Sequence, residues 1–574
     1  MPGSIDLAEY LFTRLRQLGL GAVHGVPGDY NLQLIDFVEP SGLTWVGSAN
    51  ELNAGYAADG YARVKGIGAV LTTFGVGELS AINAIAGAYT ELAPVVHIVG
   101  TPRRESRDSR LLIHHTFNDG DYGRFAKMHA EVTHAQAHLR DPRSSAQQID
   151  EVLQQCLLSS RPVYIDIPLD MVTTPVSRAR LDTPIEIPEP EFNPAEDEVV
   201  RQIAQRITAC RQPVILVDGE SKSLGIVDAV QRLASSSGWP TWTAPFGKGL
   251  LDETPASFHG VFNGSFHDDA TREYIEHADV ILNFGPHYSS TNSSHYTAIP
   301  RVDATIAFTT LGVKIAKDTF RDVSSKRILE RVLQEVDFAK IQITSAHESL
   351  SRDSLLDIQA EDSPNQITQD RVWRYLGKIV RSGDILMGET GTAGYGCRSI
   401  PLPPRTIFFS PVTWLSIGYM LPAAQGASLA QRELARESKY FGIEDARTIL
   451  FIGDGSFQMT AQELATIIKH KLDVTIFLIN NDGYTIERCI HGRKQVYNDI
   501  SFWRYLLAPE FFGADKDTYT ASAKTWGELQ DAINHPSFVE RKGLKMVEVC
   551  LGRDDSPPGL LSHLMKTQID RDGM

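Results

Sequence analysis

Two short turns rich in glycine, aspartate and asparagine, at residues 453–456 and 481–484, contain residue types that bind metal ions and phosphate groups. The carboxylate of Asp454, the side-chain carbonyl of Asn481 and the backbone carbonyl of Gly483 are oxygen ligands of the kind that Mg²⁺ takes. The glycines of the first turn let a phosphate approach the backbone closely, and a helix that starts there offers its N-terminal amides to the anion. Together the turns could bind a diphosphate group and its metal ion.

The same residue types are common in ordinary tight turns, so each turn taken alone is weakly specific. The pair is more specific, because a single helix-like segment joins the two strand-like runs that precede them. The carboxyl ends of neighbouring parallel strands are where ligands of such sheets bind. We therefore predict that both turns lie at one edge of a parallel sheet.

Apolar runs that alternate with helix-like patterns must form the sheets that position these turns. The alternation predicts an α/β fold in which parallel sheets are flanked by helices. The clearest runs are 69–73, 95–99, 163–167, 214–217, 280–283, 448–452 and 474–479.

Two stretches of different composition divide the chain. Residues 173–198 are rich in proline, and residues 345–366 are polar and rich in Ser and Asp, so both predict connections rather than packed elements. Three domains of ordinary size follow: an N-terminal domain at 1–180, a central domain at 195–343 and a C-terminal domain at 366–574.

The overall composition disfavours several classes of protein. The chain has 574 residues, with 55 Lys and Arg against 71 Asp and Glu, which gives a formal net charge of −16. An acidic protein repels a nucleic-acid backbone and an anionic membrane surface, so we expect neither as a partner. The uncharged stretch 406–431 is long enough to span a bilayer, but its prolines and polar residues predict a buried turn and helix.

The five cysteines are far apart and form no CxxC pair, which predicts neither a disulfide framework nor a structural zinc site. The first 20 residues mix acids, arginines and apolar residues, as an amphipathic helix does and a signal peptide does not. We expect a soluble protein of the cytoplasm.

Further motifs extend from one end of the chain to the other: GVPGDYNL at 25–32, ANELNAGYAADGYAR at 49–63, TTFGVGELSA at 72–81, LLIHHTFNDGD at 111–121, ETGT at 389–392, GDGS at 453–456 and NNDGYTIE at 480–487. With them the chain resembles the thiamine-diphosphate enzymes, and it is most similar to the pyruvate decarboxylase family of fungi. The resemblance implies a pyrimidine-binding domain first, a nucleotide-fold-like central domain without a cofactor, and a diphosphate-binding domain last.

The same resemblance implies the cofactors and the assembly. Thiamine diphosphate would be bound with Mg²⁺, and the metal would be held by Asp454, Asn481 and Gly483. The protein would be a homo-oligomer, a dimer or a dimer of dimers such as a homotetramer. Its active sites would lie at the interface between two subunits.

Five ionisable residues match the catalytic groups of that family. Glu51 matches the glutamate that hydrogen-bonds the aminopyrimidine ring, where an apolar site favours a shared proton. Without the resemblance, an acid in a first helical turn is usually only a partner of the helix dipole. The other four match groups that surround the reacting carbon, which must be protonated after CO₂ leaves. They are Asp29, His114, His115 and Glu487. Of these, Asp29, His115 and Glu487 would contact the substrate.

The uncharged stretch matches the segment that holds the cofactor between its two rings, and Ile417 is the stiff, β-branched wedge expected there. Leu415 replaces a glycine whose carbonyl normally accepts a bond from the cofactor. The contact requires backbone angles that suit leucine. The full set of cofactor-binding residues would be Glu51, Thr390, Thr392, Val412, Leu415, Ile417, Gly453, Asp454, Gly455, Ser456, Asn481, Gly483, Tyr484, Thr485 and Ile486.

A second departure lies in the central domain. Residues 218–221 occupy the region in which yeast-type relatives carry a cysteine linked to substrate activation, and no cysteine lies between Cys210 and Cys397. We therefore expect no activation through that thiol, and hyperbolic kinetics.

The resemblance predicts non-oxidative decarboxylation of a 2-oxo acid, with pyruvate converted to acetaldehyde and CO₂. An indolepyruvate, phenylpyruvate or branched-chain 2-oxo acid decarboxylase is the alternative within this class, with Ile486 and Ile490 shaping the pocket. A dinucleotide-binding oxidoreductase would use Gly75 and Gly77, but the third glycine of that motif is missing. A catalytically silent relative would have no need of all five ionisable groups.

Overall fold

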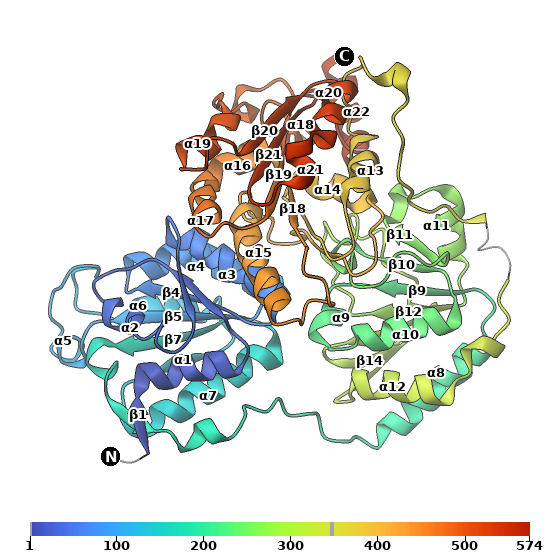
Figure 1. Cartoon of the computed structure of the whole chain (residues 1–574). Helices are drawn as coiled ribbons and strands as arrows, with labels where there is room; N and C mark the ends of the chain where they lie inside the picture. The colour runs from blue at the N-terminus through green and yellow to red at the C-terminus, as the bar shows by residue number, and fades with distance from the viewer. Residues whose placement is uncertain (1–2, 345–348, 574) are drawn as a thin grey trace.

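The computed structural model describes residues 3–344 and 349–573 and contains three parallel-sheet layers flanked by helices, as the sequence predicts (Figure 1). The first sheet belongs to the N-terminal region, and all of its strand pairs are parallel. In spatial order its strands are β3 (Thr44–Gly47), β2 (Ala22–Gly25), β4 (Gly68–Thr73), β5 (Val95–Thr101), β7 (Val163–Pro168) and β6 (Gln136–His138). The helices that flank it include α1 (Leu7–Gln17), α3 (Glu51–Lys65), α4 (Val76–Thr90) and α7 (Pro142–Ser159).

The central sheet departs from the all-parallel expectation at one edge. Its strands, in spatial order, are β11 (Phe258–Val261), β10 (Thr241–Thr243), β9 (Pro213–Val217), β12 (Val280–Phe284), β13 (Thr305–Thr309), β14 (Gly312–Ile315) and β15 (Asp318–Arg321). The first five strands are parallel, and β14 and β15 pair antiparallel. Short hairpins suit this edge because antiparallel strands need no crossover helix. The helices around this sheet include α8 (Ala195–Ala209), α10 (Val227–Ser237), α11 (Asp269–Glu276) and α12 (Ser325–Glu335).

The third sheet carries both of the glycine-rich turns. It is fully parallel, in the order β17 (Ile407–Phe409), β16 (Ile385–Gly388), β18 (Thr448–Gly453), β19 (Val474–Asn480), β21 (Lys545–Cys550) and β20 (Tyr519–Ala523). β18 and β19 are direct neighbours, so the turns that follow them lie at the same edge, as predicted. The helices of this region include α13 (Val372–Leu376), α14 (Thr392–Gly396), α15 (Met420–Arg436), α16 (Asp454–Thr460), α18 (Thr485–Ile490) and α22 (Leu560–Gly573).

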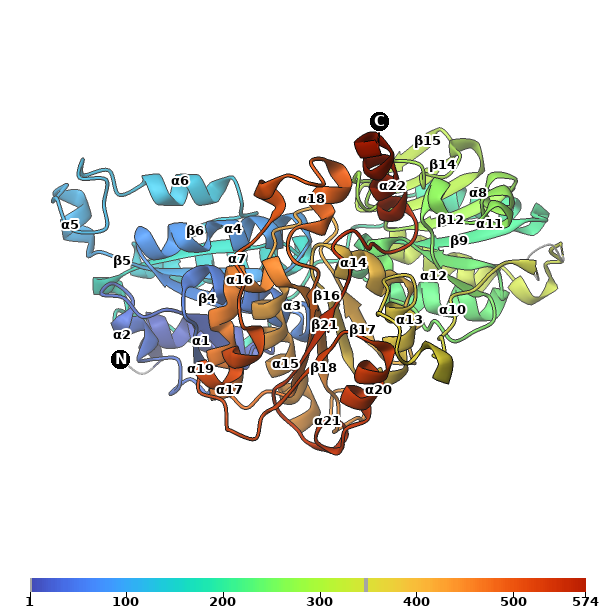
Figure 2. The ribbon, with the colours of Figure 1, turned by 90° about the horizontal axis from the view of Figure 1, so that it is seen from above.

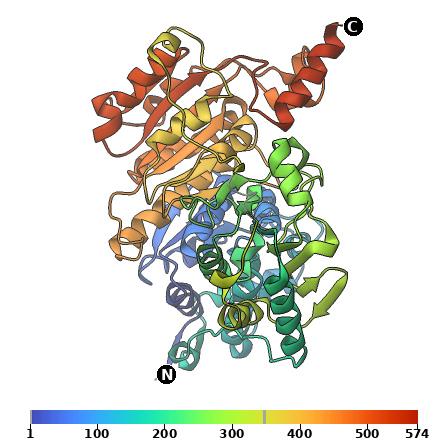
Figure 3. The same cartoon turned by 90° about the vertical axis from the view of Figure 1, so that its right-hand side faces the viewer.

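The three regions meet around the base of the third sheet. An extended connection leads from the first sheet to α8 along the bottom of the molecule in Figure 1. Seen from the side of the central sheet, the C-terminal region lies above the other two, and the final helix projects at the top (Figure 3). Figure 2 shows α3 beside α15, which joins the first region to the third.

Small residues let α3 and α15 approach closely. A Cβ atom added to Gly426 would lie 1.9 Å from the carbonyl oxygen of Ala57, and one added to Gly60 would lie 2.1 Å from that of Ala423. Residues 420–431 of α15 are all buried, so the second half of the uncharged stretch forms a packed helix, as predicted. The turn before it is not fully buried, since Trp414 is exposed. Within the described ranges, no helix has the length and apolar composition needed to cross a membrane.

Candidate active site

The two glycine-rich turns are tied together by the carboxylate of Asp454. This residue begins α16, directly after β18. One of its oxygens accepts the backbone N–H of Gly455 at 2.8 Å, and the other accepts that of Gly483, after β19, at 3.0 Å. The carboxylate thus sets the position of one turn relative to the other.

The oxygens of the two turns are largely buried. Asp454 is only 2% exposed, and burial raises the pKa of its carboxyl to about 6. Asn481 is buried beside it on the second turn. The Gly483 carbonyl accepts the N–H of Thr485 at 3.0 Å and keeps a second lone pair. A divalent cation among these oxygens would offset the burial of the carboxylate.

In the part of the chain that the structure describes, no three His, Cys, Asp or Glu side chains gather in a metal-binding arrangement. The predicted set differs from such a cluster because it contains a single carboxylate. Amide and backbone oxygens supply its other ligands.

Arg488 holds the backbone of the second turn in place through hydrogen bonds, a role that no sequence motif indicated. Its guanidinium is fully buried and donates to the backbone carbonyls of Asp482 at 2.6 Å and Asn498 at 3.1 Å. It also donates to a carboxylate oxygen of Asp499 at 3.0 Å. These bonds hold the left-handed backbone of Asp482 and Gly483, whose φ angles are 57° and 119°.

A second buried acid, Glu389, joins two predicted cofactor-binding loops. It accepts the N–H of Thr390 at 2.7 Å and the N–H of Met420 at 2.8 Å, and burial raises its pKa to about 8. The hydroxyl of Ser456 in the first turn donates to the Thr390 carbonyl at 3.4 Å. The loop 389–392, the first turn and the start of α15 therefore lie together.

The segment 412–414, just ahead of the predicted wedge Ile417, is held by one carboxylate oxygen of Glu91. That oxygen accepts three consecutive backbone N–H groups, at 3.0 Å from Val412, 2.8 Å from Thr413 and 3.1 Å from Trp414. Glu91 is 4% exposed and lies at the C-terminal end of α4, on the first domain. Neither the position nor the role of Glu91 followed from a motif.

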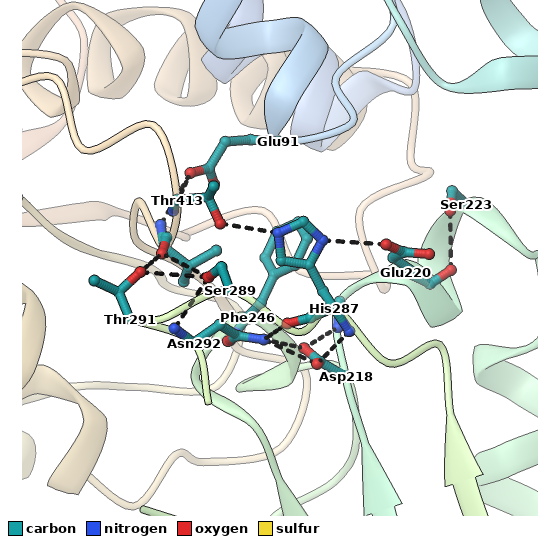
Figure 4. Close-up of polar contacts among 12 residues, drawn as sticks. Glu91, Asp218, Glu220, Ser223, Phe246, His287, Ser289, Thr291, Asn292 and Thr413 are labelled. Carbon is teal, nitrogen blue, oxygen red and sulfur yellow. Dashed lines mark hydrogen bonds and ion pairs between the residues drawn. The ribbon is translucent and has the colours of Figure 1, made fainter. Parts of the chain in front are cut away.

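The central domain holds the same segment from the other side (Figure 4). His287 lies 2.8 Å from the Thr413 hydroxyl through Nε2 and 3.1 Å from Glu220 through Nδ1. The hydroxyl of Thr291 donates to the backbone carbonyl of Val412. Burial alone would lower the pKa of His287, but Glu220 and Asp218 raise it above its ordinary value. The segment is thus in contact with all three domains.

Leu415 adopts the backbone conformation that glycine would adopt. Its φ is 55°, in the left-handed region that leucine rarely occupies. The leucine therefore keeps a glycine-like backbone conformation, at a strain cost of about 1–3 kcal/mol.

Glu51 begins α3, and a Cβ atom added to Gly77 in the first turn of α4 would lie 3.0 Å from its carboxylate. Asn50 caps the helix through its side chain, which accepts the N–H of Asn53 at 2.9 Å. Burial raises the pKa of Glu51. Further along α3, Tyr56 shares a 2.7 Å hydrogen bond with Ser416, so the helix that carries Glu51 contacts the segment that ends in the predicted wedge.

The structure brings Asp29, His114 and His115 together but leaves Glu487 apart. The Nε2 atom of His114 lies 3.1 Å from Asp29, and the two histidine rings are 4.7 Å apart between centroids. Burial and the neighbouring His114 lower the pKa of His115. Glu487 is exposed on α18, and no hydrogen bond or ion pair joins it to these three residues in the described structure.

The remaining predicted residues lie at the starts of two helices or beside the first turn. Thr392 begins α14; Thr485 and Ile486 lie at the start of α18. Tyr484 packs against Gly455, where an added Cβ would lie 2.5 Å from its ring. α22 covers α18 through contacts of Leu561 and Met565 with Cys489.

At the glycines that suggested a dinucleotide site, a side chain of the protein already binds the backbone. Gly75 caps α4, and its N–H is bound at 2.8 Å by the side chain of Glu78 from the same helix. Tyr164 donates to the second oxygen of Glu78 at 2.9 Å, and burial raises the pKa of Glu78 to about 8. A phosphate would have to displace this buried acid, so the structure disfavours the oxidoreductase interpretation.

Comparison with known proteins identifies one family along the chain. Models of the thiamine pyrophosphate enzymes match its N-terminal TPP binding domain at residues 5–124, its central domain at 200–336 and its C-terminal TPP binding domain at 390–541. A pyruvate decarboxylase of Aspergillus parasiticus is 52% identical over 575 residues, covering 99% of this chain and 98% of the relative.

More distant relatives carry the same name. The pyruvate decarboxylase of Aspergillus fumigatus is 42% identical, covering 97% of this chain and 96% of the relative. Pyruvate decarboxylase isozyme 2 of Saccharomyces cerevisiae is 36% identical, covering 98% of each chain.

Replacement of Leu415 by glycine tests whether the backbone, rather than the side chain, matters at this position. We expect L415G to bind thiamine diphosphate within about threefold of the wild type and to unfold at an equal or higher temperature, because relief of left-handed strain offsets the added chain entropy. Cofactor titration by tryptophan fluorescence and thermal unfolding measure the two effects. Loss of cofactor binding in L415G would show that the leucine side chain itself is required.

Proposed function

The chain belongs to the thiamine pyrophosphate enzymes, and on this premise we propose that it decarboxylates pyruvate non-oxidatively to acetaldehyde and CO₂, with thiamine diphosphate and Mg²⁺ as cofactors. The observation that carries the proposal is the Asp454–Gly483 contact, which joins two turns of metal- and phosphate-binding composition beside the segment held by Glu91. The assignment of pyruvate as the substrate rests on the names of the relatives.

The residues around the turns fit the cofactor. A Cβ added to Gly453 would have no atom within 4 Å, and one added to Gly391 would reach only Ile486, at 4.0 Å. The hydroxyl of Thr390 is buried near the carboxylate of Glu389. The backbone is therefore open where a diphosphate group would lie.

We infer that Asp454, Asn481 and Gly483 hold Mg²⁺ and that loops 390–392, 412–417, 453–456 and 483–486 hold thiamine diphosphate. The bound cofactor would supply an electron sink for the carbon that loses CO₂. Leu415 would offer its carbonyl, and Ile417 its branched side chain, to the cofactor from the segment that Glu91 positions.

The ionisable residues would move or hold protons around that carbon. The raised pKa of Glu51 favours its protonated form, which lets it share a proton with a ring nitrogen. Asp29 orients His114, whose Nδ1 lies 3.3 Å from the Tyr30 hydroxyl. Asp29, His115 and Glu487 would contact the substrate, with Glu487 approaching from α18.

We further infer a homo-oligomer, a dimer or dimer of dimers, that acts in the cytoplasm with its active sites between subunits. The exposure of the histidine group supports this arrangement, because Asp29 and His114 are 73% and 54% exposed in the single chain. A second subunit could cover these side chains and exclude water from the reaction. We propose no partner besides the 2-oxo acid, the cofactors and a further copy of the chain.

Cofactor removal and a neutral substitution at Glu51 test the proposed reaction. We expect acetaldehyde and CO₂ from pyruvate only when thiamine diphosphate and Mg²⁺ are present, and loss on chelation with EDTA. E51Q should lower kcat at least about 100-fold, because general acid–base catalysis contributes on that order. E39Q, at an exposed glutamate, is the matched control and should keep full activity.

The same assay ranks the substrates across a panel of 2-oxo acids. Pyruvate should give the highest kcat/KM with a hyperbolic dependence on concentration. Faster turnover of phenylpyruvate, indolepyruvate or a branched-chain 2-oxo acid would overturn the pyruvate assignment, and an unchanged rate in E51Q would remove Glu51 from the mechanism.

Mixing two inactive variants tests whether two subunits build each site. E51Q lacks a group of the first domain, and D454N lacks one of the third. If the domains come from different subunits, half of the randomly mixed dimers regain one intact site, so about a quarter of the wild-type activity returns. The variants are unfolded and refolded together, and each refolded alone is the control. No recovery on mixing, from variants that each assemble normally, would place the whole site within one chain.

A further inference from the structure

A cavity of about 310 Å³ lies between the central and C-terminal domains, apart from the candidate active site. Its walls come from residues 261–268 after β11, from α13 and α14, and from residues 557–560 ahead of α22. Figure 1 shows α13, α14 and α22 grouped near the top of the molecule, above β11. None of the residues that line the cavity is a predicted catalytic, cofactor or metal residue. Its volume suits a small ligand.

The feature that requires explanation is Arg398, which lines this cavity. The residue is 6% exposed, and its guanidinium carbon lies 4.3 Å from the centre of the Tyr395 ring. Among the described residues it has no hydrogen-bond acceptor and no carboxylate partner, and its Nε atom is buried without a partner. Burial lowers the pKa of this guanidinium. The buried, unpaired donor is the Nε–H of this guanidinium, and burying a donor without an acceptor is costly.

A second arginine lines the same cavity. Arg374, on α13, is half-buried and makes no side-chain hydrogen bond or ion pair in the described ranges. His267 also faces the cavity, and burial lowers the pKa of its ring. The site therefore presents two forked donors and an imidazole.

Among the described residues, the acids of the lining form no hydrogen bond or ion pair with either arginine. Asp268 is already engaged, since it accepts the N–H of Thr271 at 2.9 Å and the hydroxyl of Ser351 at 2.8 Å. Burial raises the pKa of Asp353 to about 6, and the charges of Lys248 and Arg374 oppose that rise, so Asp353 is a carboxylate near Arg374 that forms no ion pair with it. Asp370 is exposed and makes no ion pair with a described residue.

We propose that this cavity binds a small anion, a carboxylate or a phosphate, through the guanidinium groups of Arg374 and Arg398. Both anion types offer oxygens that match the forked geometry of arginine. Ligand binding would give Arg398 the acceptor that it lacks. The proposal concerns binding and stands whether or not the proposed reaction is correct.

The site is placed to influence the cofactor-binding loops. Arg398 follows α14, which begins at Thr392, and Tyr395 packs in one apolar cluster with Ile486 and Leu564. Thr291 lines the cavity and also donates to the carbonyl of Val412. A bound anion would therefore link the central domain, α14 and the C-terminal helix.

The test measures saturable binding of inorganic phosphate and, separately, of oxamate by calorimetry and thermal shift. The full chain is kept in excess thiamine diphosphate and Mg²⁺ to occupy the diphosphate turns, and ionic strength is held constant with sodium chloride. We expect R398Q and R374Q each to weaken binding at least about tenfold, the value of one charge-assisted contact. R398K, which keeps the charge but loses the fork, should bind with intermediate affinity.

The matched control is R143Q, which removes one positive charge at a residue that is 89% exposed on the first domain. It should bind both anions as the wild type does. A response to only one anion identifies phosphate or carboxylate as the ligand class. Equal binding in wild type, R398Q and R374Q, or no saturable binding of either anion, would overturn the proposal. The anion titration is repeated with EDTA and without thiamine diphosphate. This repeat shows whether anion binding depends on cofactor binding.

Discussion

Three backbone N–H groups in a row converge on one oxygen of Glu91, and the geometry of the candidate active site depends on this contact. Hydrogen bonds to a buried carboxylate are stronger than neutral ones, and three on one oxygen fix the direction of the chain that they leave. The next residues are Leu415 and Ile417, the predicted cofactor contacts. An acid at the end of α4 therefore sets the position of a segment more than 300 residues away in sequence.

A domain without cofactor motifs also contacts the segment that Glu91 holds. The central domain reaches the opposite side of the same segment through His287 and Thr291. Asp218 in turn accepts the backbone N–H of His287 at 2.8 Å. The segment thus belongs to the C-terminal domain and contacts the other two. These contacts fix its backbone conformation, which lets it keep a strained residue such as Leu415.

The fold was largely predictable because it rests on local signals. Alternating apolar runs and helix-like patterns predict three parallel layers, and the turns after β18 and β19 meet because parallel neighbours end at the same edge. The two antiparallel strands at the edge of the central sheet were missed, since short hairpins have the same strand-like composition.

The residues that hold the loops of the candidate site in place were less predictable. Glu91, Arg488 and His287 are single ionisable residues whose partners lie far away in sequence or are backbone groups, so no spacing reveals them. Glu389 and Glu78 lie within quoted motifs, but the motifs alone do not give their hydrogen-bond partners. Glu78 occupies the helix N-terminus that a glycine motif had suggested for a dinucleotide.

The most direct test of this account is the thiamine diphosphate affinity of E91A in the presence of Mg²⁺, measured beside E39A at an exposed glutamate. If Glu91 positions the cofactor segment, E91A should remain folded by circular dichroism but bind the cofactor at least about tenfold more weakly, while E39A binds normally. An E91A protein that binds thiamine diphosphate as tightly as the wild type would contradict the account.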